Sequence, residues 1–199
     1  MLYYSTIEPE TLELLKKLQQ LSSLQNTRLV GGTSLALQIG HRISIDIDLF
    51  GNITAEEDIL IEELKTLGTL KIIKNSKNVR IYLLNNIKVD LVNYAYPWLE
   101  NAVYEDDICM AGLKDIAAMK LAAVTGRGSK KDFIDICFLS RKYTLKEMLS
   151  FYAEKYPEGS DFMVLKSLSY FEDAEQDPNP NMQQNLTWEQ AKKQILSLL

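Results

Sequence analysis

The chain has 199 residues, of which 46% are hydrophobic and 25% are charged, proportions typical of one or two folded globular domains. Two cysteines are too few for a disulfide scaffold and lack the spacing of a zinc site, and a single histidine excludes a multi-histidine metal centre. The net charge of −5 gives no bulk attraction to nucleic acid. The sequence has neither an apolar run of about 18 residues nor an export signal, so we expect a cytoplasmic protein with no membrane partner.

The N-terminal segment predicts a helix, a short strand and a second helix. Apolar residues recur at helical spacing over residues 9–24. A short apolar strand over residues 28–30 leads to Gly31-Gly32, after which residues 33–39 favour a helix that begins with hydroxyl residues.

A change of period marks the next element. Residues 43–50 alternate with period two, which predicts a strand with its isoleucines and Leu49 on one face. Asp46 and Asp48 share the opposite face, roughly 6.6 Å apart along the backbone.

Two further alternating runs predict a hairpin. Residues 79–84 and 87–93 are joined by Asn85-Asn86, a pair that tolerates the positive φ angles of a two-residue turn. The second run carries Asp90.

The rest of the chain favours helices. They are expected over about 55–67, 112–125, 130–142, 144–155 and 160–172, with a last short helix that begins at a Thr187–Gln190 capping box. Residues 173–186, rich in proline and asparagine, are typical of a linker. We therefore predict an α+β fold: a domain over residues 1–105 with a small mixed sheet and flanking helices, followed by a helical bundle over 106–199.

The three aspartates form the first candidate site. A neighbouring strand can bring Asp90 beside Asp46 and Asp48, and three crowded carboxylates repel one another unless a cation neutralises them. The cluster predicts one or two Mg²⁺ ions.

The Gly31-Gly32 turn forms the second candidate site. Glycines before a helix let a ligand approach the backbone closely and present N–H groups, with the hydroxyls of Thr33 and Ser34 beside them, to phosphate oxygens. Taken singly, a Gly-Gly pair is commonly only a turn, and an Asp-x-Asp is commonly an exposed strand face. Together, at this spacing, they favour adjacent metal and nucleotide sites.

The combination of motifs resembles the nucleotidyltransferase superfamily typified by DNA polymerase β, whose pattern is a hydrophobic residue, Gly-Gly or Gly-Ser, a spacer, Asp-x-Asp and a third carboxylate on a later strand. More closely, LVGGTSLALQIGHRISIDIDLF resembles the opening motif of the AbiEii/AbiGii toxin family of nucleotidyltransferase-like proteins. The resemblance covers roughly residues 25–172.

A second match is DIAAMKLAAVTGRGSKKDFIDICFL. Lys120 falls on the apolar stripe of its helix, where a lysine either snorkels to solvent or, as the resemblance implies, reaches a phosphate. The family counts an acidic residue after this lysine as essential. Asp132 is the better candidate, although Ser129 to Asp132 also fits a capping box, and Asp135 lies one turn further on the same face.

Other charged residues leave alternatives open. Arg42 either contacts a triphosphate or pairs with a nearby Asp, and His41 fits a structural role. A basic cluster either grips an RNA backbone or is a solvated helix face; it comprises Arg127, Lys130, Lys131, Arg141 and Lys142.

The resemblance implies transfer of a nucleoside monophosphate from an NTP to an acceptor, with RNA such as tRNA expected, by the toxin of a toxin–antitoxin or abortive-infection pair. An antitoxin protein is the implied partner. Alternatives are a nucleotidyltransferase that modifies a small molecule or a protein, and a nucleotide-binding module without catalysis.

Overall fold

The computed structural model describes residues 1–126 and 128–199. The chain forms two compact units. The first comprises Met1–Ile39, Ser44–Ala95 and Ala102–Ala111, and the second comprises Gly40–Ile43, Tyr96–Asn101 and Gly112–Leu199. The domain boundary predicted from the sequence, at residue 105, falls inside a hairpin of the first unit.

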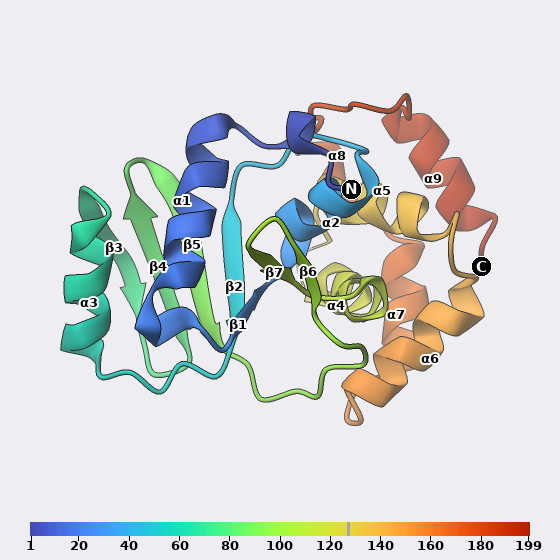
Figure 1. The fold of residues 1–199 in the computed structure, drawn as a ribbon. Helices are drawn as coiled ribbons and strands as arrows, with labels where there is room; N and C mark the ends of the chain where they lie inside the picture. The colour runs from blue at the N-terminus through green and yellow to red at the C-terminus, as the bar shows by residue number, and fades with distance from the viewer. Residues whose placement is uncertain (127) are drawn as a thin grey trace. The chain divides into compact units, whose positions relative to one another are not determined.

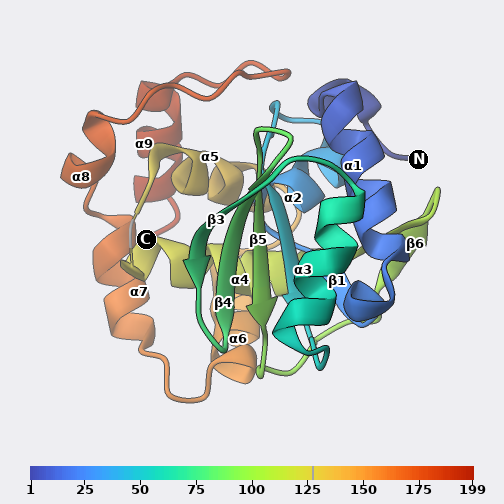
Figure 2. The same cartoon turned by 90° about the vertical axis from the view of Figure 1, so that its left-hand side faces the viewer.

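The first unit is built on a mixed sheet, seven-stranded over the described residues, of order β3-β4-β5-β2-β1-β7-β6 (Figure 1). The β2–β5 and β1–β7 pairs are parallel, and the remaining pairs are antiparallel. Figure 2 shows β3, β4 and β5 side by side. The strands are β1 (Thr27–Leu29), β2 (Ile47–Gly51), β3 (Leu70–Asn75), β4 (Val79–Leu84), β5 (Ile87–Asn93), β6 (Val103–Glu105) and β7 (Ile108–Met110).

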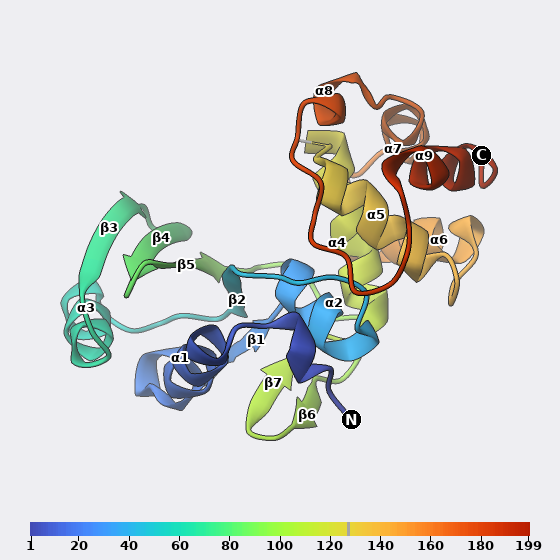
Figure 3. The same cartoon turned by 90° about the horizontal axis from the view of Figure 1, so that it is seen from above.

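Helices α1 and α3 cover one face of this sheet (Figure 3). Leu15 and Leu18 of α1 and Leu60 of α3 are fully buried, and they pack in one cluster with strand residues such as Leu49 and Leu91. The apolar stripe at helical spacing therefore faces the core. The helical elements of this unit are α1 (Pro9–Gln20), α2 (Gly31–Ile39), α3 (Glu57–Thr66) and two 3-10 turns, η1 (Tyr4–Thr6) and η2 (Ser22–Leu24).

The predicted strand over residues 43–50 is too long. Strand β2 begins only at Ile47, and Ile45, expected on the apolar face, is 62% exposed. The backbone N–H of Ser44 donates instead to the carbonyl of Thr6 at 2.9 Å, so it takes no part in the sheet ladder. Asp46 therefore precedes the strand that carries Asp48, and the expected shared strand face for these two residues is wrong.

The β4–β5 hairpin has the predicted bounds and turn. Asn85 and Asn86 have φ angles of 52° and 65°, as a two-residue turn requires. Three strands carry no clear pattern in the sequence. Most of β3 is exposed and its burial does not alternate, and β6 and β7 have three residues each, too few to show a period.

The second unit is helical. Helix α4 packs against α5, α6 and α7, and α5 packs against α9. The predicted capping box at Thr187 and Gln190 is present, and the expected helix over 160–172 is divided into α7 and α8. The helices are α4 (Leu113–Gly126), α5 (Lys130–Leu139), α6 (Leu145–Lys155), α7 (Asp161–Leu168), α8 (Glu172–Glu175) and α9 (Trp188–Leu196). No helix in the described part of the chain is long and apolar enough to cross a membrane.

The hairpin turn provides a test of the fold. Replacing Asn86 by valine puts a β-branched residue at a positive φ angle, so we expect Asn86→Val to lower the free energy of unfolding by about 1–3 kcal/mol. Asn86→Gly removes the steric conflict and is the matched control, with a stability close to that of the wild type. Urea denaturation measures both. Equal stabilities for the two variants would show that the turn does not hold this conformation.

Candidate functional site

Two of the predicted aspartates are direct neighbours across the sheet. Strands β2 and β5 run parallel, and their register pairs Asp48 with Asp90. Paired residues project to the same face, so both carboxylates stand on one face of the sheet. Both residues are half-buried. This pairing brings together residues that are 42 positions apart in the chain.

The glycine turn contacts one of these carboxylates. Gly31 has a φ of +68° at the start of α2, and a side chain at this position would overlap Oδ2 of Asp48. The N–H of Val30 donates to the backbone carbonyl of Asp48 at 2.9 Å. Only glycine fits here, since the backbone conformation is left-handed and the carboxylate lies against the Cα atom.

The neighbouring hydroxyl groups are occupied within the fold. Thr33 is buried and its hydroxyl donates to the backbone carbonyl of Asp46 and contacts the hydroxyl of Ser44 at 2.9 Å. Ser34 is also buried, and its hydroxyl accepts a bond from Gln38 at 3.1 Å. By contrast, Gly31 and Gly32 are half-buried.

The third carboxylate has one satisfied and one unsatisfied oxygen. Lys88 Nζ lies 2.7 Å from Oδ2 of Asp90, whose side chain is 21% exposed. Oδ1 of Asp90 is buried and has no hydrogen-bond partner among the described residues. A carboxylate oxygen without a donor suits a hard cation such as Mg²⁺, so the donor set fits a metal ion.

The three aspartates do not form an assembled metal cage. Within residues 1–126 and 128–199, no group of three or more His, Cys, Asp or Glu side chains is arranged to hold a metal ion. Asp90 faces Lys88 instead. Metal binding at Oδ1 of Asp90 would leave the Lys88 contact at Oδ2 in place.

A second charged group lies within the helical unit. Lys120 of α4 is 4% exposed, and its Nζ lies 2.8 Å from Oδ1 of Asp132 and 2.6 Å from Oδ2 of Asp135. The lysine does not snorkel to solvent. Although burial lowers the pKa of Lys120, the two carboxylates outweigh this effect and raise it above its ordinary value.

Asp132 does not act as part of a capping box. Ser129 is the N-cap of α5, and in the described structure its hydroxyl makes no cap bond but donates to the carboxylate of Asp132. The sequence pattern is that of a cap, but the carboxylate turns to Lys120 because a buried ammonium needs an opposite charge.

Asp135 also binds the segment Gly40–Ile43. Arg42 donates from Nε and Nη2 to the two carboxylate oxygens at 2.7 and 2.9 Å, and His41 Nε2 lies 2.7 Å from Oδ1. Burial raises the pKa of Asp135, but the charges of Arg42 and Lys120 hold it well below its usual range. Of the two roles open for Arg42, the structure has the pairing with a nearby Asp.

The basic cluster is only in part a solvated face. Lys130 is buried, and its Nζ contacts the backbone carbonyl of Asp177 at 2.7 Å. The guanidinium of Arg141 stands 3.9 Å from the ring centre of Phe138. Arg127 lies outside the described residues.

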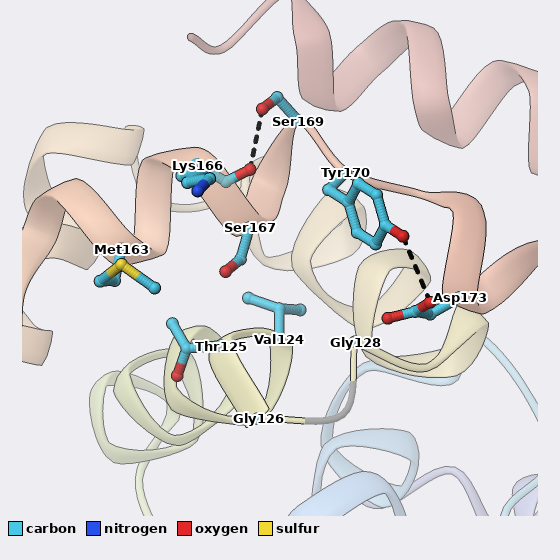
Figure 4. A pocket seen from close by; sticks show the side chains of 10 residues that line it. All are labelled: Val124, Thr125, Gly126, Gly128, Met163, Lys166, Ser167, Ser169, Tyr170 and Asp173. Atoms are coloured by element: carbon cyan, nitrogen blue, oxygen red, sulfur yellow. Dashed lines mark hydrogen bonds between the residues drawn. The ribbon is translucent and has the colours of Figure 1, made fainter.

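A pocket of about 340 Å³ opens in the helical unit between the end of α4, Gly128, α7 and the segment that leads to Asp173 (Figure 4). Its ten described lining residues include one lysine and one carboxylate, and none is a predicted site residue. The hydroxyl of Tyr170 donates to Asp173 at 3.4 Å. A lone carboxylate in the lining does not make a metal site, so we retain the aspartate and glycine group as the candidate centre.

The family profile described as "Nucleotidyl transferase AbiEii toxin, Type IV TA system" matches residues 13–199. The chain belongs to the AbiEii nucleotidyltransferase toxin family. An uncharacterized protein of Aquifex aeolicus (strain VF5) is 38% identical to it over 177 residues, which cover 86% of each protein.

Two solved structures share the AbiEii fold. JHP933 of Helicobacter pylori has a TM-score of 0.59 and 17% identity, over 96% of this chain and 91% of that one. MenT4, a nucleotidyltransferase toxin of Mycobacterium tuberculosis H37Rv, has a TM-score of 0.57 and 12% identity, over 95% of this chain and 82% of that one. The α+β nucleotidyltransferase fold is thereby confirmed.

The sequence patterns of this AbiEii chain did not identify Asp135 as a residue with several partners. The spacing of Asp132 and Asp135 placed both on one helix face, but it gave no sign that Asp135 binds residues 93 and 94 positions away. A second buried ion pair, between Lys155 and Asp115 at 2.7 Å, was also missed. Both are long-range contacts, for which a single sequence carries no signal.

The single histidine allows a direct test of the buried group. Burial lowers the pKa of His41 below 6.5; its bond to Asp135 opposes this shift, and the charges of Arg42 and Lys120 add to it. The folded state therefore takes up fewer protons than the unfolded state as the pH falls through 6.5, and this difference lowers stability toward acid pH. An NMR titration of the one imidazole should give a pKa below 6.5.

The matched variant for this test is His41→Gln, which lacks the titrating group. The decline of stability that the wild type shows below pH 6.5 should be smaller in this variant. An imidazole pKa at or above 6.5 would mean that His41 is protonated beside Asp135.

Proposed function

We propose that this AbiEii nucleotidyltransferase transfers a nucleoside monophosphate from an NTP to RNA, such as a tRNA, and releases pyrophosphate. The observation that carries the proposal is the pairing of Asp48 with Asp90 across β2 and β5, with Gly31 against the Asp48 carboxylate. Two carboxylates beside a glycine turn at a helix start suit a metal-bound triphosphate.

Asp46, Asp48 and Asp90 would hold one or two Mg²⁺ ions. The buried Oδ1 of Asp90, which no described residue hydrogen-bonds, supports this assignment. When bound, Mg²⁺ neutralises charge on the phosphates and lowers the pKa of an acceptor hydroxyl. Lys88 Nζ contacts the carboxylate of Asp90 at 2.7 Å and limits its repulsion of Asp48.

The start of α2 would bind the phosphates. The backbone N–H groups of Gly31 and Gly32 can approach phosphate oxygens closely, since no side chain intervenes. Thr33 and Ser34 support this turn through their buried hydroxyls, one of which fixes the backbone of Asp46. In this proposal Asp90 would also accept the proton of the acceptor hydroxyl.

Lys120, Asp132 and Arg42 take a supporting role in this proposal. The family resemblance implies a phosphate contact for Lys120, and this role was one of two open for Arg42, but both cations are more than nine-tenths buried and paired with carboxylates. Moving either cation away would leave its buried carboxylate partner without a compensating positive charge, which costs several kcal/mol. We therefore assign the Lys120–Asp132 pair to holding the helices, not to contact with the nucleotide.

A role as the toxin of a toxin–antitoxin pair follows from the family. We infer that expression of the chain alone arrests growth through nucleotidyl transfer, and that a cognate antitoxin relieves the arrest.

The aspartates provide the first test of the mechanism. Asp48→Asn and Asp46→Asn each remove one metal-binding charge, so we expect NMP transfer to fall by about a thousandfold or more without unfolding. Asp58→Asn, which removes an exposed carboxylate on α3, is the control and should keep wild-type activity. Transfer rates and growth arrest measure the effect. Wild-type rates in either site variant would refute the assignment.

Gly31 provides the second test. Gly31→Ala pushes the Asp48 carboxylate out of its place, although a rotation of that side chain limits the cost to stability. We expect transfer to fall by about a hundredfold and the free energy of unfolding to fall by about 1–2 kcal/mol, since alanine is strained at this positive φ angle. Gly126→Ala is the matched control, since a side chain there meets no described atom within 4 Å. Full activity in Gly31→Ala would show that transfer does not depend on the contact between the Asp48 carboxylate and the glycine turn.

A labelling assay identifies the acceptor. Each of CTP, ATP, GTP and UTP, labelled at the α-phosphate, is incubated with Mg²⁺ and with total RNA, proteins or small molecules separately. We expect label in RNA. Label in protein or in a small molecule would overturn the RNA acceptor but keep the reaction, and binding of Mg-NTP without transfer would favour the non-catalytic module.

A further inference from the structure

One stretch of the chain is strongly basic although the protein as a whole is acidic. Residues 64–89 contain five lysines, one arginine and no aspartate or glutamate, whereas the whole chain has a net charge of −5. The stretch comprises the end of α3, the strands β3 and β4 and the start of β5. A local excess of positive charge attracts anions to that part of the surface, even when the net charge of the protein has the opposite sign.

Three of these six cations have partners or are buried within the fold. Lys65 pairs with Glu62 at 2.8 Å, and Lys88 pairs with Asp90 at 2.7 Å. Arg80 is 8% exposed and lies on the buried face of β4. The three that remain on the surface, which we call the β3 lysines, are Lys71, Lys74 and Lys77.

The β3 lysines have exposed side chains on a fixed backbone. None of the three forms an ion pair with another residue that the structure describes. Strand β3 pairs with β4 along its length, and beyond the strand the carbonyl of Lys77 accepts a bond from Nδ2 of Asn93 at 3.1 Å. The ammonium groups are therefore available to a partner, while the segment that carries them is held in place.

A register shift in the β3–β4 pair sets the direction of two of these side chains. In a regular strand, residues three positions apart point to opposite faces of the sheet. Lys71 pairs with Leu83 of β4, but the register then shifts and Lys74 pairs with Ile81. Leu83 and Ile81 lie two positions apart on one face of β4, so the two lysines share that face.

This face is the one that carries two of the candidate metal-binding aspartates. Ile81 of β4 pairs with Asp90 of β5, and Asp90 pairs with Asp48 of β2. Lys74 therefore stands in the same row as both aspartates, and Lys71 stands in the next row (Figure 2). All of these residues belong to the first unit. Neighbouring strands are about 4.8 Å apart, so the backbones of β3 and β2 are separated by roughly 14 Å.

We propose that the β3 lysines bind the sugar–phosphate backbone of the acceptor RNA, a few nucleotides away from the hydroxyl that receives the nucleoside monophosphate. The inference rests on the proposed function, which makes RNA the acceptor. A polyanion suits a row of unpaired ammonium groups, because each contact releases a counterion condensed on the nucleic acid. Contacts to phosphate carry no base information, so this surface holds and directs the RNA without reading its sequence.

Lysines on an edge strand also have a second use. β3 lies at one edge of the sheet, and charged side chains on an edge strand hinder its pairing with a strand of another molecule. That role does not require the register shift, since a lysine on either face would supply the charge. The placement of Lys71 and Lys74 on the face of the aspartates therefore favours the RNA contact.

The first experiment measures RNA affinity without catalysis. The variant combines Lys71→Gln, Lys74→Gln and Lys77→Gln, and the probe is bulk tRNA labelled with fluorescein at its 5′ end, with no NTP present. Fluorescence anisotropy gives the Kd over a range of salt concentrations. We expect the Kd to rise by about a hundredfold at about 0.1 M salt, and the slope of log Kd against log salt concentration to fall by about 2.

A matched control removes the same charge from another part of the chain. Lys146, Lys166 and Lys193 are exposed and form no ion pair with a described residue, so their combined replacement by glutamine changes the net charge equally. This control should keep the wild-type Kd and slope. Replacement of the β3 lysines by arginine keeps the charge and should also keep the slope. All of these side chains are exposed, so we expect each variant to fold, as circular dichroism can verify.

Steady-state kinetics separate RNA binding from nucleotide binding. The glutamine variant of the β3 lysines should have a higher KM for RNA, with the KM for NTP and the kcat at saturating RNA unchanged. A higher KM for NTP alone would place these lysines at the triphosphate and overturn the proposal. An equal loss of RNA affinity in the control would also overturn it, as would wild-type affinity in a glutamine variant that self-associates in sedimentation.

The two proposals fail in different ways. If the wild type transfers no nucleotide to any acceptor, the proposed function fails, whereas the anisotropy assay still tests whether the β3 lysines bind RNA. If the wild type labels RNA and the glutamine variant binds RNA with the wild-type affinity and salt dependence, the proposed function stands and the inference about β3 is wrong.

Discussion

A charge inside a protein must find an opposite charge or a set of hydrogen bonds, because taking an ion out of water costs several kcal/mol. The helical unit meets this constraint at two buried carboxylates. Asp135 pairs with several cations, whereas Asp115 pairs with one cation and accepts backbone N–H groups. The sheet unit meets it only in part, since Asp90 keeps a buried oxygen that receives no donor from the described part of the chain. The difference separates charges that hold the structure from a charge that is available to a ligand.

This distinction orders the residues of an AbiEii nucleotidyltransferase by role. Carboxylates with unmet or exchangeable bonds, such as Asp90 with Lys88, belong to the proposed chemistry. In the same proposal, carboxylates whose described partners form buried ion pairs, such as Asp132, hold the helices. A residue in the second class can be indispensable for activity without touching the substrate, since the reacting groups must be held within a fraction of an ångström.

The sequence predicted those parts of the fold that depend on local patterns. The β4–β5 hairpin, the capping box at Thr187 and the stripe of α1 follow from turn chemistry and periodicity. The alternation of polar and apolar residues wrongly predicted a strand at Ile45, which lies outside the sheet. The pairing of Asp48 with Asp90 was anticipated as a possibility of neighbouring strands, whereas its register is set by the tertiary fold. The partners of Asp135 depend on contacts between distant segments, and no local rule describes them.

The bridge between Arg42 and Met182 closes a ring that contains most of the polypeptide. During synthesis on the ribosome, this ring cannot close until Met182 and its neighbours have emerged from the exit tunnel. A nascent chain that ends before Met182 therefore has the glycine turn and all three aspartates. It lacks the bridge that holds the segment leading to the aspartates. The segment that leads to the aspartates therefore gains this backbone bridge later in synthesis than the glycine turn is made.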